Sequence, residues 1–555
     1  MVDAEDLKSS GVTPCGFESR PRHPHKNMNN KYYVTIGLEI HAELNTASKM
    51  WCNCANVPLE ETANKNICPI CMAHPGTLPV ANAKALEKMI QIGLAVRSDI
   101  EKEAGTYNNI SNFIEFDRKN YFYPDIPKAY QITQYQYPLV NGGAIKAIVN
   151  GNAHNITLTR IHLEEDTAKS SHDKGDYTVI DFNRAGVPLM ELVTDAHTYD
   201  DVDTAAAVSS EFAKELRRIL RTLGAGDADM EKGQMRVEAN ISVTQDKNKY
   251  GTKCEVKNLN SFKSVEDAIK YEVNRHIELL ESGEKVIQET RGWDENKRST
   301  FSQRKKENAH DYRYFPDPDL PKLYTYELFD ILKIMGSLPI LPEDRRNILN
   351  DIGLNTKQVS MLLDDVALCD YYFSAINVMH KDEDKLTLAN YLLTDVVGTI
   401  SKVNTNNNID IEKIDNNNLN KNLSTKLPNI KFMIELVTMI SQGLLSSRGA
   451  KDIIAIAINE NKSDMGAQAL AEANGLIQQN DDEALKLIVN KVIENNPIQW
   501  AEYKGNSTKK SDEGKLSNVD KPGNEKLLMY FVGQCMKESK GGANPGAITA
   551  IIKSL

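Results

Sequence analysis

Two carboxylates and an imidazole fall close together on one face of a short segment of the chain. Residues 33–45 alternate apolar and polar side chains, so Glu39, His41 and Glu43 would share one face of an extended strand. Gly37 lies on the same face and leaves room for a ligand to approach the backbone. Acidic oxygens beside an imidazole could bind a metal ion, although a half-solvated antiparallel strand has the same alternation.

The same alternation returns in three later segments. Their polar positions are Arg160, His162, Glu164 and Asp166 in residues 156–166, Arg236, Glu238, Asn240 and Ser242 in residues 236–243, and Lys253, Glu255 and Lys257 in residues 252–258. Glu165 would face the opposite side, and Glu191 interrupts an apolar run. These segments predict one largely antiparallel sheet, with helices on its apolar face and a second face rich in charged groups.

Such a charged face suits phosphoryl transfer. Glu and Asn oxygens are the hard ligands that Mg²⁺ prefers, and the ion usually bridges carboxylates to the phosphates of a nucleotide. Interspersed Arg and Lys would stabilise the charge on a transferring phosphoryl group. The sequence contains no G-x-x-x-x-G-K-[ST] loop, so a P-loop fold would not bind the nucleotide. A solvated sheet with compensating charges is the alternative interpretation.

Four of the eight cysteines are grouped on one loop. Cys52 and Cys54 are followed by Cys68 and Cys71, with Asn, Pro and Thr between the two pairs. Four thiolates can close a tetrahedral zinc site that leaves no position for a substrate, so the predicted zinc is structural. Reduced surface thiols are the alternative. Eight cysteines in a chain of this length, without a secretion signal, indicate a reducing compartment rather than a disulfide framework.

An aromatic run lies at residues 116–123, where Arg118 and Lys119 stand among Phe and Tyr, with Lys128 shortly after. Rings beside cations could stack nucleic-acid bases and contact phosphates. Aromatic side chains packed beneath a proline-rich loop would give the same composition. Both interpretations stay open at this point.

The length of 555 residues predicts about three domains at roughly 150 residues each. Residues 1–31 carry early acids and several prolines without an apolar core, and we expect a disordered leader rather than a signal or transit peptide. No apolar run is long enough to span a membrane. A net charge of −11 argues against general polyanion binding but allows a local basic surface.

Helical spacing of apolar residues marks the segments that would support the sheet and follow it. Helices are predicted at residues 81–96 and 265–280, and short amphipathic helices at 343–349 and 357–364. Residues 404–424 are rich in Asn, which predicts a surface insertion or connector. Helical patterns resume afterwards, and the candidate phosphate contacts there are Lys526, Lys537, Lys540 and Lys553.

Six segments of this sequence resemble the B-subunit family of the tRNA-dependent amidotransferases. They are residues 36–41 (IGLEIH), 116–124 (FDRKNYFYP), 162–166 (HLEED), 183–189 (NRAGVPL), 257–262 (KNLNSF) and 311–319 (DYRYFPDPD). They occur in the family's order, and the four-cysteine loop matches the zinc-bearing members. The resemblance runs from about residue 32 to the end of the chain.

The resemblance implies an α+β fold. Residues 32–325 would form a glutamine synthetase-like cradle with a largely antiparallel sheet, which includes the zinc loop of residues 52–71. An α-helical domain would follow at residues 326–403, then an Asn-rich linker at residues 404–426. Residues 427–555 would be a helical YqeY-like tail that binds tRNA.

The resemblance also implies an activity. With ATP and Mg²⁺, the chain would phosphorylate the side-chain carboxylate of Glu-tRNA(Gln), Asp-tRNA(Asn) or both, and ammonia would then displace phosphate. Ammonia would come from the A-type amidase (glutaminase) subunit, within a cytoplasmic heterotrimer that includes a small C-type subunit. The implied metal and phosphate-site residues are Glu39, His41, Glu164, Glu165, Glu191 and Glu255. The expected nucleotide contacts are Lys119, Arg160, Arg236, Glu238 and Asn240.

Two other functions compete with this one. A zinc-containing adaptor that binds or edits tRNA would have no use for a sheet face lined with Glu. A small-molecule amide ligase of the glutamine synthetase type would have no use for a long helical tail. The carboxylate face and the tail therefore favour the transamidating subunit together.

Overall fold

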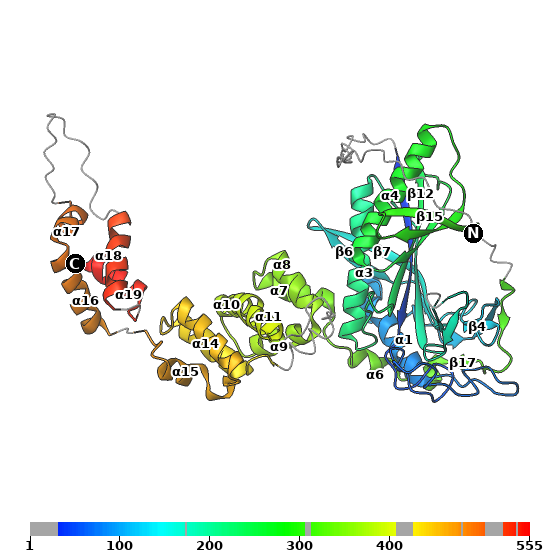
Figure 1. The fold of residues 1–555 in the computed structure, drawn as a ribbon, viewed down its shortest axis with the longest axis horizontal. Coiled ribbons are helices and arrows are strands. Elements are labelled where there is room, and N and C mark those ends of the chain that lie inside the picture. Colours follow the sequence, from blue (N-terminus) through cyan, green and yellow to red (C-terminus); the bar gives the residue numbers. More distant parts are fainter. Residues whose placement is uncertain are drawn as a thin grey trace, which may run out of the picture.

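A computed structural model describes residues 32–171, 175–305, 312–406, 426–478, 481–505, 525–539 and 542–555. The expected leader and nearly all of the expected Asn-rich linker lie outside these residues. The sheet occupies one end of the molecule, and helical units follow it in a row (Figure 1). Among the described residues, no helix is long and apolar enough to cross a membrane.

The main sheet has ten strands and runs in the order β15-β14-β13-β12-β1-β10-β7-β5, with β11 paired to β1 and β6 paired to β7. Its strands are β1 (Tyr33–Glu43), β5 (Val140–Asn141), β6 (Ala144–Val149), β7 (Asn152–Glu165), β10 (Pro188–Thr194), β11 (His197–Tyr199), β12 (Met235–Thr244), β13 (Cys254–Leu259), β14 (Glu289–Asp294) and β15 (Ser299–Lys305). The pair β13–β14 is parallel, and the other pairs are antiparallel. The predicted largely antiparallel sheet is confirmed.

Three small sheets flank the main one. They join β3 (Asp117–Asn120) to β4 (Tyr130–Thr133) and β16 (Phe315–Pro316), β2 (Phe113–Ile114) to β17 (Leu323–Tyr324), and β8 (Lys169–Ser171) to β9 (Val179–Asp181). The first two bring the segment after residue 312 back against the aromatic run near residue 116.

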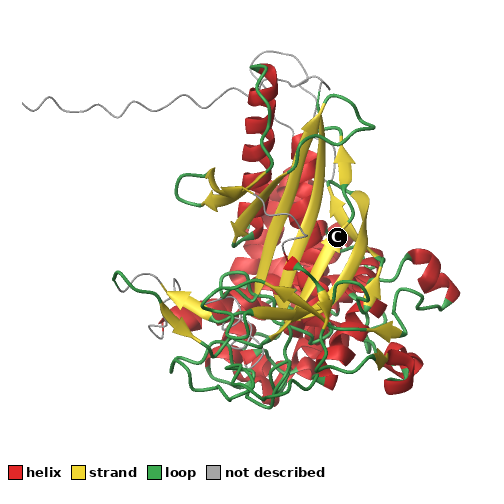
Figure 2. Ribbon diagram, turned by 90° about the vertical axis from the view of Figure 1, so that its right-hand side faces the viewer, coloured by secondary structure: helices red, strands yellow, loops and turns green. Residues whose placement is uncertain are grey.

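Helices cover one face of the main sheet, and the strands lie in front of them in Figure 2. These helices are α1 (Ala83–Ala95), α3 (Val202–Thr222) and α4 (Phe262–Glu281), and the short α2 (Asp99–Ala104) follows α1 without a buried residue of its own. Each of the long ones begins at a polar cap, such as Asp201, whose side chain accepts from the Thr204 backbone N–H, and Ser261, which does the same for Ser264. The helices predicted at residues 81–96 and 265–280 are α1 and α4.

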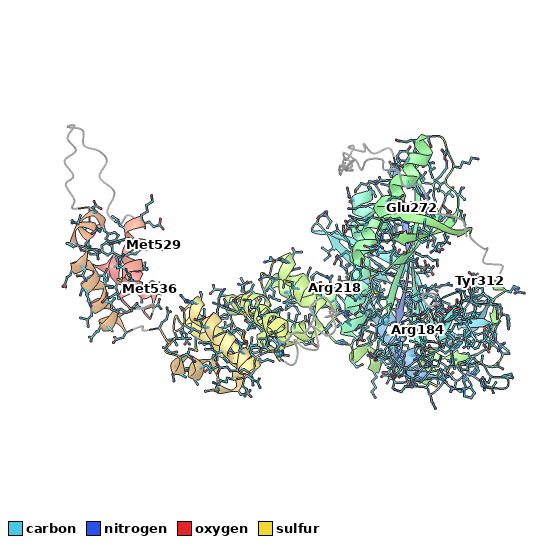
Figure 3. All side chains as sticks on the ribbon, in the orientation of Figure 1. Arg184, Arg218, Glu272, Tyr312, Met529 and Met536 are labelled. Atoms are coloured by element: carbon cyan, nitrogen blue, oxygen red, sulfur yellow. The ribbon has the colours of Figure 1, made fainter. Side chains whose placement is uncertain are left out.

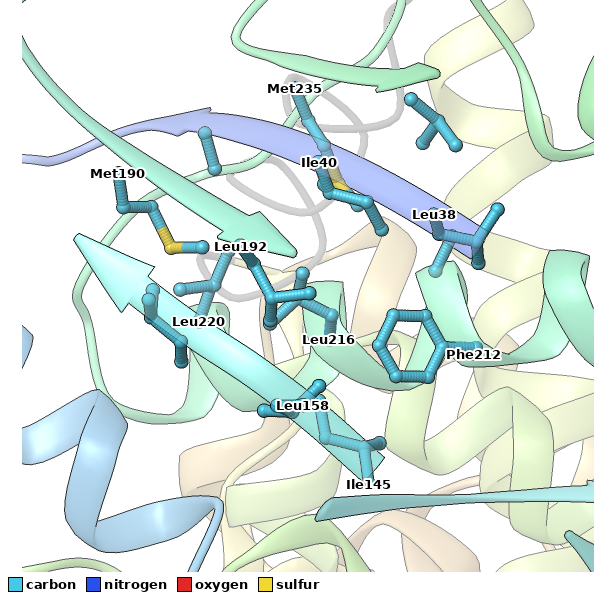
Figure 4. Packing of buried hydrophobic residues seen from close by; sticks show 14 of the residues in the cluster. Leu38, Ile40, Ile145, Leu158, Met190, Leu192, Phe212, Leu216, Leu220 and Met235 are labelled. Carbon is cyan, nitrogen blue, oxygen red and sulfur yellow. The ribbon is translucent and has the colours of Figure 1, made fainter. Parts of the chain in front are cut away.

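The apolar positions of β1 are the ones that meet this helical layer. Leu38 and Ile40 are buried, and Phe212 and Leu216 of α3 are buried opposite them (Figure 4). Because successive side chains of a strand point to opposite faces, burial of these residues turns Glu39 and His41 away from the core. The packing of the sheet therefore determines which face carries the chemistry.

Most of the remaining helices form two further cores, whereas Ile331, at the start of a short helix, is buried in the core of the main sheet. One core contains buried residues from Leu349 to Ala471, and the other contains residues from Leu485 to Ile552. The helices are α5 (Thr325–Leu328), α6 (Ile331–Gly336), α7 (Pro342–Asp351), α8 (Thr356–Asp364), α9 (Val366–Ile376), α10 (Asp382–Tyr391), the π-helix η2 (Leu392–Val396), α11 (Val397–Asn406), α13 (Ile430–Ser441), α14 (Ser447–Asn459), the 3₁₀-helix η4 (Ser463–Met465), α15 (Ala467–Ala473), α16 (Asp482–Asn495), α17 (Pro497–Tyr503), α18 (Glu525–Glu538) and α19 (Pro545–Ser554).

The first of these cores joins helices on both sides of the expected Asn-rich linker. Phe432 and Leu436 of α13 are buried in the same cluster as Leu388 and Leu392. A chain cut near residue 404 would therefore expose this core. The last four helices, α16 to α19, form a separate core that a shorter truncation can remove.

A buried carboxylate of α4 ties this helix to the edge strands of the sheet. Glu272 has no solvent exposure, and its oxygens lie 3.0 Å from Arg275 Nε, 3.1 Å from His276 Nε2 and 2.8 Å from Thr300 Oγ1 of β15 (Figure 3). Burial alone would raise the pKa of this carboxyl, but the hydrogen bonds from His276 and Arg275 prevail and lower it to about 2.

We expect Glu272→Gln to lower the free energy of unfolding by about 3 kcal/mol at pH 7, because the charge that these donors stabilise is lost. The native pKa lies below the ordinary value of 4.5, so this stabilisation is complete above pH 4.5 and disappears as the pH falls toward 2. Urea unfolding of both proteins between pH 7 and pH 3 should therefore give a difference that narrows with acid. A difference in unfolding free energy that stays constant with pH would contradict the role assigned to Glu272.

Candidate functional site

Strand register places the predicted polar residues side by side. His41 of β1 stands opposite Glu191 of β10, which in turn stands opposite His162 of β7. On the other side of β1, Glu39 stands opposite Glu238 of β12. Residues directly opposite in antiparallel strands share a face, so these side chains form one continuous surface.

His41 lies at the centre of a group of carboxylates. Its Nε2 atom lies 3.2 Å from Glu191 Oε2, 3.5 Å from Glu164 Oε1 and 3.8 Å from Glu39 Oε1. His162 Nε2 approaches the same Glu191 oxygen at 3.6 Å. One imidazole thus connects acids from β1, β7 and β10.

A second group of acids lies beside the first. Glu39, Glu238 and Glu255 each present an oxygen within 4.8 Å of the others. Lys257 Nζ lies 2.5 Å from Glu238 Oε2 and 3.8 Å from Glu255 Oε2. Thr290 Oγ1 donates to Glu255 at 2.8 Å. Glu39 belongs to both groups, so we call the two together the carboxylate cluster: Glu39, His41, His162, Glu164, Glu191, Glu238 and Glu255.

The acids of the cluster repel one another. Burial, together with the charges of Glu191 and Glu238, raises the pKa of Glu39 to about 7. Burial and the charge of Glu191 likewise raise the pKa of Glu164 to about 7. Such shifts mean that the negative charges are costly without a cation nearby, which is typical of functional sites.

The pair His41–Glu191 carries charge of both signs. Burial opposes a charged imidazole, but the hydrogen bond and the charge of Glu191 raise the pKa of His41 to about 10. Burial also opposes ionisation of Glu191, yet His162 and His41 hold the pKa of its carboxyl below the ordinary value. An ion pair at the centre of the sheet face is therefore stable across neutral pH.

The cluster fits a hard divalent cation. Three overlapping sets of its ligand atoms each lie within 4.8 Å of one another, and most of these ligands are carboxylate oxygens. Asn240 Oδ1 on β12 is buried and has no hydrogen-bond partner among the described residues. An orphaned amide oxygen beside several carboxylates is a donor set that suits Mg²⁺.

Three of the expected nucleotide contacts lie at the edges of this cluster. Arg236 forms an ion pair with Asp166, and the charges of Asp166 and Glu43 keep its pKa above the ordinary value. Lys119 of β3 lies near the rings of two tyrosines, and the charges of Glu164 and Glu191 raise its pKa against the effect of burial. Arg160 donates to the backbone oxygen of Tyr135 at 3.3 Å.

Glu165 is the predicted site residue that the structure does not bring into the cluster. Its side chain accepts from Lys128 Nζ at 2.5 Å and from the Ile132 backbone N–H at 3.1 Å. Beside Glu165 lies a cavity of about 10 Å³, whose lining includes Glu165, Lys128, Cys71 and Gly186. Glu165 is therefore a structural neighbour of the cysteine loop.

The four cysteines of the loop come together as the spacing predicted. Their sulfur atoms all lie within 4.8 Å of one another, which suits a metal ion bound by Cys52, Cys54, Cys68 and Cys71. The segment just before the loop is attached to the turn that precedes β10, because the Met50 backbone N–H donates to Gly186 O at 2.7 Å. A metal ion here would hold the loop against the turn that leads into β10.

Several residues near the cluster were missed as site candidates by sequence reasoning. The alternation placed His162 and Lys257 on the polar faces of their strands, but neither was named among the site residues. Lys128 and Asp166 act through contacts with residues far along the chain. No local spacing marks such long-range pairs.

Known proteins resemble this chain over almost its whole length. A family model described as GatB/GatE catalytic domain matches residues 34–329, and a model described as GatB domain matches residues 372–512. The B subunit of the aspartyl/glutamyl-tRNA(Asn/Gln) amidotransferase of Chlorobaculum tepidum is 37% identical over 526 residues, which is 94% of this chain and 99% of the relative.

The same subunit of Chlorobium chlorochromatii is 38% identical over 94% of this chain and 98% of the relative. That of Persephonella marina is 37% identical over 95% of this chain and 99% of the relative. The chain belongs to the B-subunit family of aspartyl/glutamyl-tRNA(Asn/Gln) amidotransferases. The predicted family is confirmed, and the first family model spans the whole carboxylate cluster.

The cysteine loop gives a direct test by elemental analysis. Purified protein should contain close to one zinc per chain, and Cys68→Ser should lose the metal because a closed thiolate site contributes directly to local folding. Cys369→Ser, at a buried thiol of α9, is the matched control and should keep the zinc. Four freely titrating thiols and no zinc in the unaltered protein would refute the prediction.

Proposed function

We propose that the chain catalyses the ATP-dependent transamidation of misacylated Glu-tRNA(Gln), Asp-tRNA(Asn) or both. The side-chain carboxylate of the tRNA-bound amino acid is phosphorylated, and ammonia then displaces phosphate to give the amide. The observation that carries the proposal is a carboxylate cluster fit for Mg²⁺ on the face of the sheet opposite to the helices, in a chain of this family.

The chain's oxygens are suited to hold the ion. Glu39, Glu164, Glu191, Glu255 and Asn240 would hold Mg²⁺, and when bound the ion supplies positive charge to the phosphates of ATP. Because the carboxylates repel one another without a cation, metal binding would relieve that repulsion. ATP affinity is therefore expected to require these acids.

Fixed cations within the cluster and beside it act on the transferring group. His41 is held as an imidazolium by Glu191, and Lys257 and Lys119 stand on either side of the acids. Preorganised positive groups stabilise the charge that spreads over a transferring phosphoryl group without reorganisation during the reaction. We assign this role to these three residues.

The proposed reaction needs partners. Ammonia would come from the A-type amidase (glutaminase) subunit, in a heterotrimer completed by the small C-type subunit, and would be delivered away from water and protonation. The relatives are named as subunits of amidotransferases that act on tRNA, which supports this assembly. We place the complex in the cytoplasm, where the free cysteines of this chain would stay reduced.

We propose that the last four helices hold the body of the tRNA. Their core is separate from that of the preceding helices, so this unit can engage a distant part of a long ligand. Lys526, Lys537 and Lys553 are the candidate phosphate contacts there, and Lys540 lies outside the described residues. The division into cradle, helical domain, linker and tail is kept as a proposal.

Glu39→Gln and Glu164→Gln should each lower ATP-dependent amidation by at least about 100-fold, because each removes a charge from the metal site without changing shape. tRNA affinity should stay within about twofold. The assay combines the partner subunits, labelled Glu-tRNA(Gln) and ATP. Glu231→Gln, at an exposed position before β12, is the control, and unaltered rates in both cluster variants would exclude these acids.

A chain that ends at residue 478 should keep ATP binding but bind tRNA about tenfold more weakly. Phosphate contacts release counterions, so the affinity of the full chain should fall steeply with salt, and the shortened chain should show a smaller slope. This cut leaves both preceding cores complete. Equal affinities and equal slopes would mean that the last helices do not contact tRNA.

A further inference from the structure

Four tyrosines form a continuous row beside the carboxylate cluster. The ring centroids of Tyr121 and Tyr312 lie 5.8 Å apart, those of Tyr312 and Tyr314 lie 6.1 Å apart, and Tyr314 stacks on Tyr135 at 4.1 Å with nearly parallel planes. We call Tyr121, Tyr312, Tyr314 and Tyr135 the tyrosine row. Tyr312 lies on the side of the sheet away from α3 and the helical units (Figure 3).

Packing alone does not account for these rings. The nearby pair Trp51 and Phe116 also makes an edge contact, but there the residues are 2% and 1% exposed, as expected for a core. Tyr135 is 46% exposed, and Tyr121, Tyr312 and Tyr314 are half-buried, so all four rings keep some contact with water. Aromatic surface of this extent in contact with water indicates a binding surface.

Cations accompany the row. Lys119 Nζ lies 5.1 Å from the ring centroid of Tyr312 and 5.7 Å from that of Tyr121, and the Arg160 guanidinium lies 5.8 Å from that of Tyr135. The chain as a whole carries a net charge of −11, so basic groups at this place are a local feature. Rings interleaved with cations complement a strand that alternates bases and phosphates.

The row is held rigidly before any ligand binds. Asn120 Nδ2 of β3 donates to the backbone oxygens of Tyr312 and Arg313 at 3.2 and 2.8 Å. Arg118 of β3 donates to Asp317 at 2.9 Å, and this bond holds the segment that follows Tyr314 against β3. The Tyr135 backbone N–H donates to Asp117 Oδ2 at 2.8 Å. Preorganised rings lose little conformational freedom on binding.

The row also reaches the carboxylate cluster. Arg160, whose guanidinium lies over the Tyr135 ring and donates to the Tyr135 backbone oxygen at 3.3 Å, shares a face of β7 with His162 and Glu164 of the cluster. A strand lying along the rings would therefore end beside the cluster. A ligand suited to this geometry has unpaired bases and a reactive group at its terminus.

We propose that the tyrosine row stacks the unpaired bases at the 3′ end of the tRNA, placing the aminoacyl group at the carboxylate cluster. The inference rests on the proposed function for the identity of the RNA. The adenine of ATP is the other source of a stacking base, but one adenine needs one ring, whereas this row offers several rings in succession.

The test compares affinities of the full chain, with its partner subunits, for intact tRNA and for the same tRNA without its unpaired 3′ nucleotides. Tyr135→Ala and Tyr314→Ala should each weaken the binding of intact tRNA about 5- to 150-fold, the range for loss of one base–aromatic stack. Both variants should bind the trimmed tRNA within about twofold of the unaltered protein. The expected signature is thus a loss that depends on the 3′ end.

Matched variants separate stacking from folding. Tyr135→Phe and Tyr314→Phe retain the ring and should bind intact tRNA as the unaltered protein does. Tyr250→Ala, at a tyrosine that is 70% exposed in the loop between β12 and β13, should have no effect. The comparison of intact with trimmed tRNA in the unaltered protein needs no substitution, so it holds even where a variant fails to fold.

Three results would overturn the proposal: equal affinity of the unaltered protein for intact and trimmed tRNA, equal loss for both RNAs in the alanine variants, or a loss of ATP affinity instead of tRNA affinity. The last result would assign the rings to adenine. If the predicted 3′-end dependence appears but the complex makes no amide with ATP, the proposed function fails and the tyrosine row stands.

Discussion

Mutual repulsion among buried carboxylates is the constraint on which the rest of the structure depends. Glu39 and Glu164 are held on one sheet face with Glu191, and burial and like charge raise the pKa of both to about 7. Leu38 and Ile40 are buried against α3 and fix the strand that carries Glu39. The side chain of Glu39 therefore stays on the face opposite to the helices, among the other acids. Gathering these charges costs free energy, and such an arrangement is typical of a site that binds a cation and a phosphate.

The sequence predicted this face well because strand alternation is a local property. The period of two along residues 33–45 assigned Glu39 and His41 to one side and Leu38 and Ile40 to the other, as the structure has them. The spacing of the four cysteines was sufficient for the same reason, since their loop is short. Local patterns identify faces and loops but not the distances between strands.

The parts that escaped prediction depend on long-range contacts. Helix α3 is an exception, because its buried residues Phe212, Leu216 and Leu220 recur at helical spacing, so a local pattern could have identified it. The parallel pairing of β13 with β14 and the ion pair of Lys128 with Glu165 join segments that no local spacing connects. The core that joins α10 to α13 across the Asn-rich segment is of the same kind. Residue types alone do not determine such pairings.

The central claim is that the carboxylate of the tRNA-bound amino acid is itself phosphorylated. The most direct measurement uses Glu-tRNA(Gln) labelled with ¹⁸O in both side-chain carboxylate oxygens, incubated with the complete enzyme, ATP and an ammonia source. An acyl phosphate that breaks at the carbonyl carbon leaves one carboxylate oxygen on phosphate, so the account predicts one ¹⁸O in the inorganic phosphate for each amide formed. Unlabelled phosphate, with amide still produced, would contradict it.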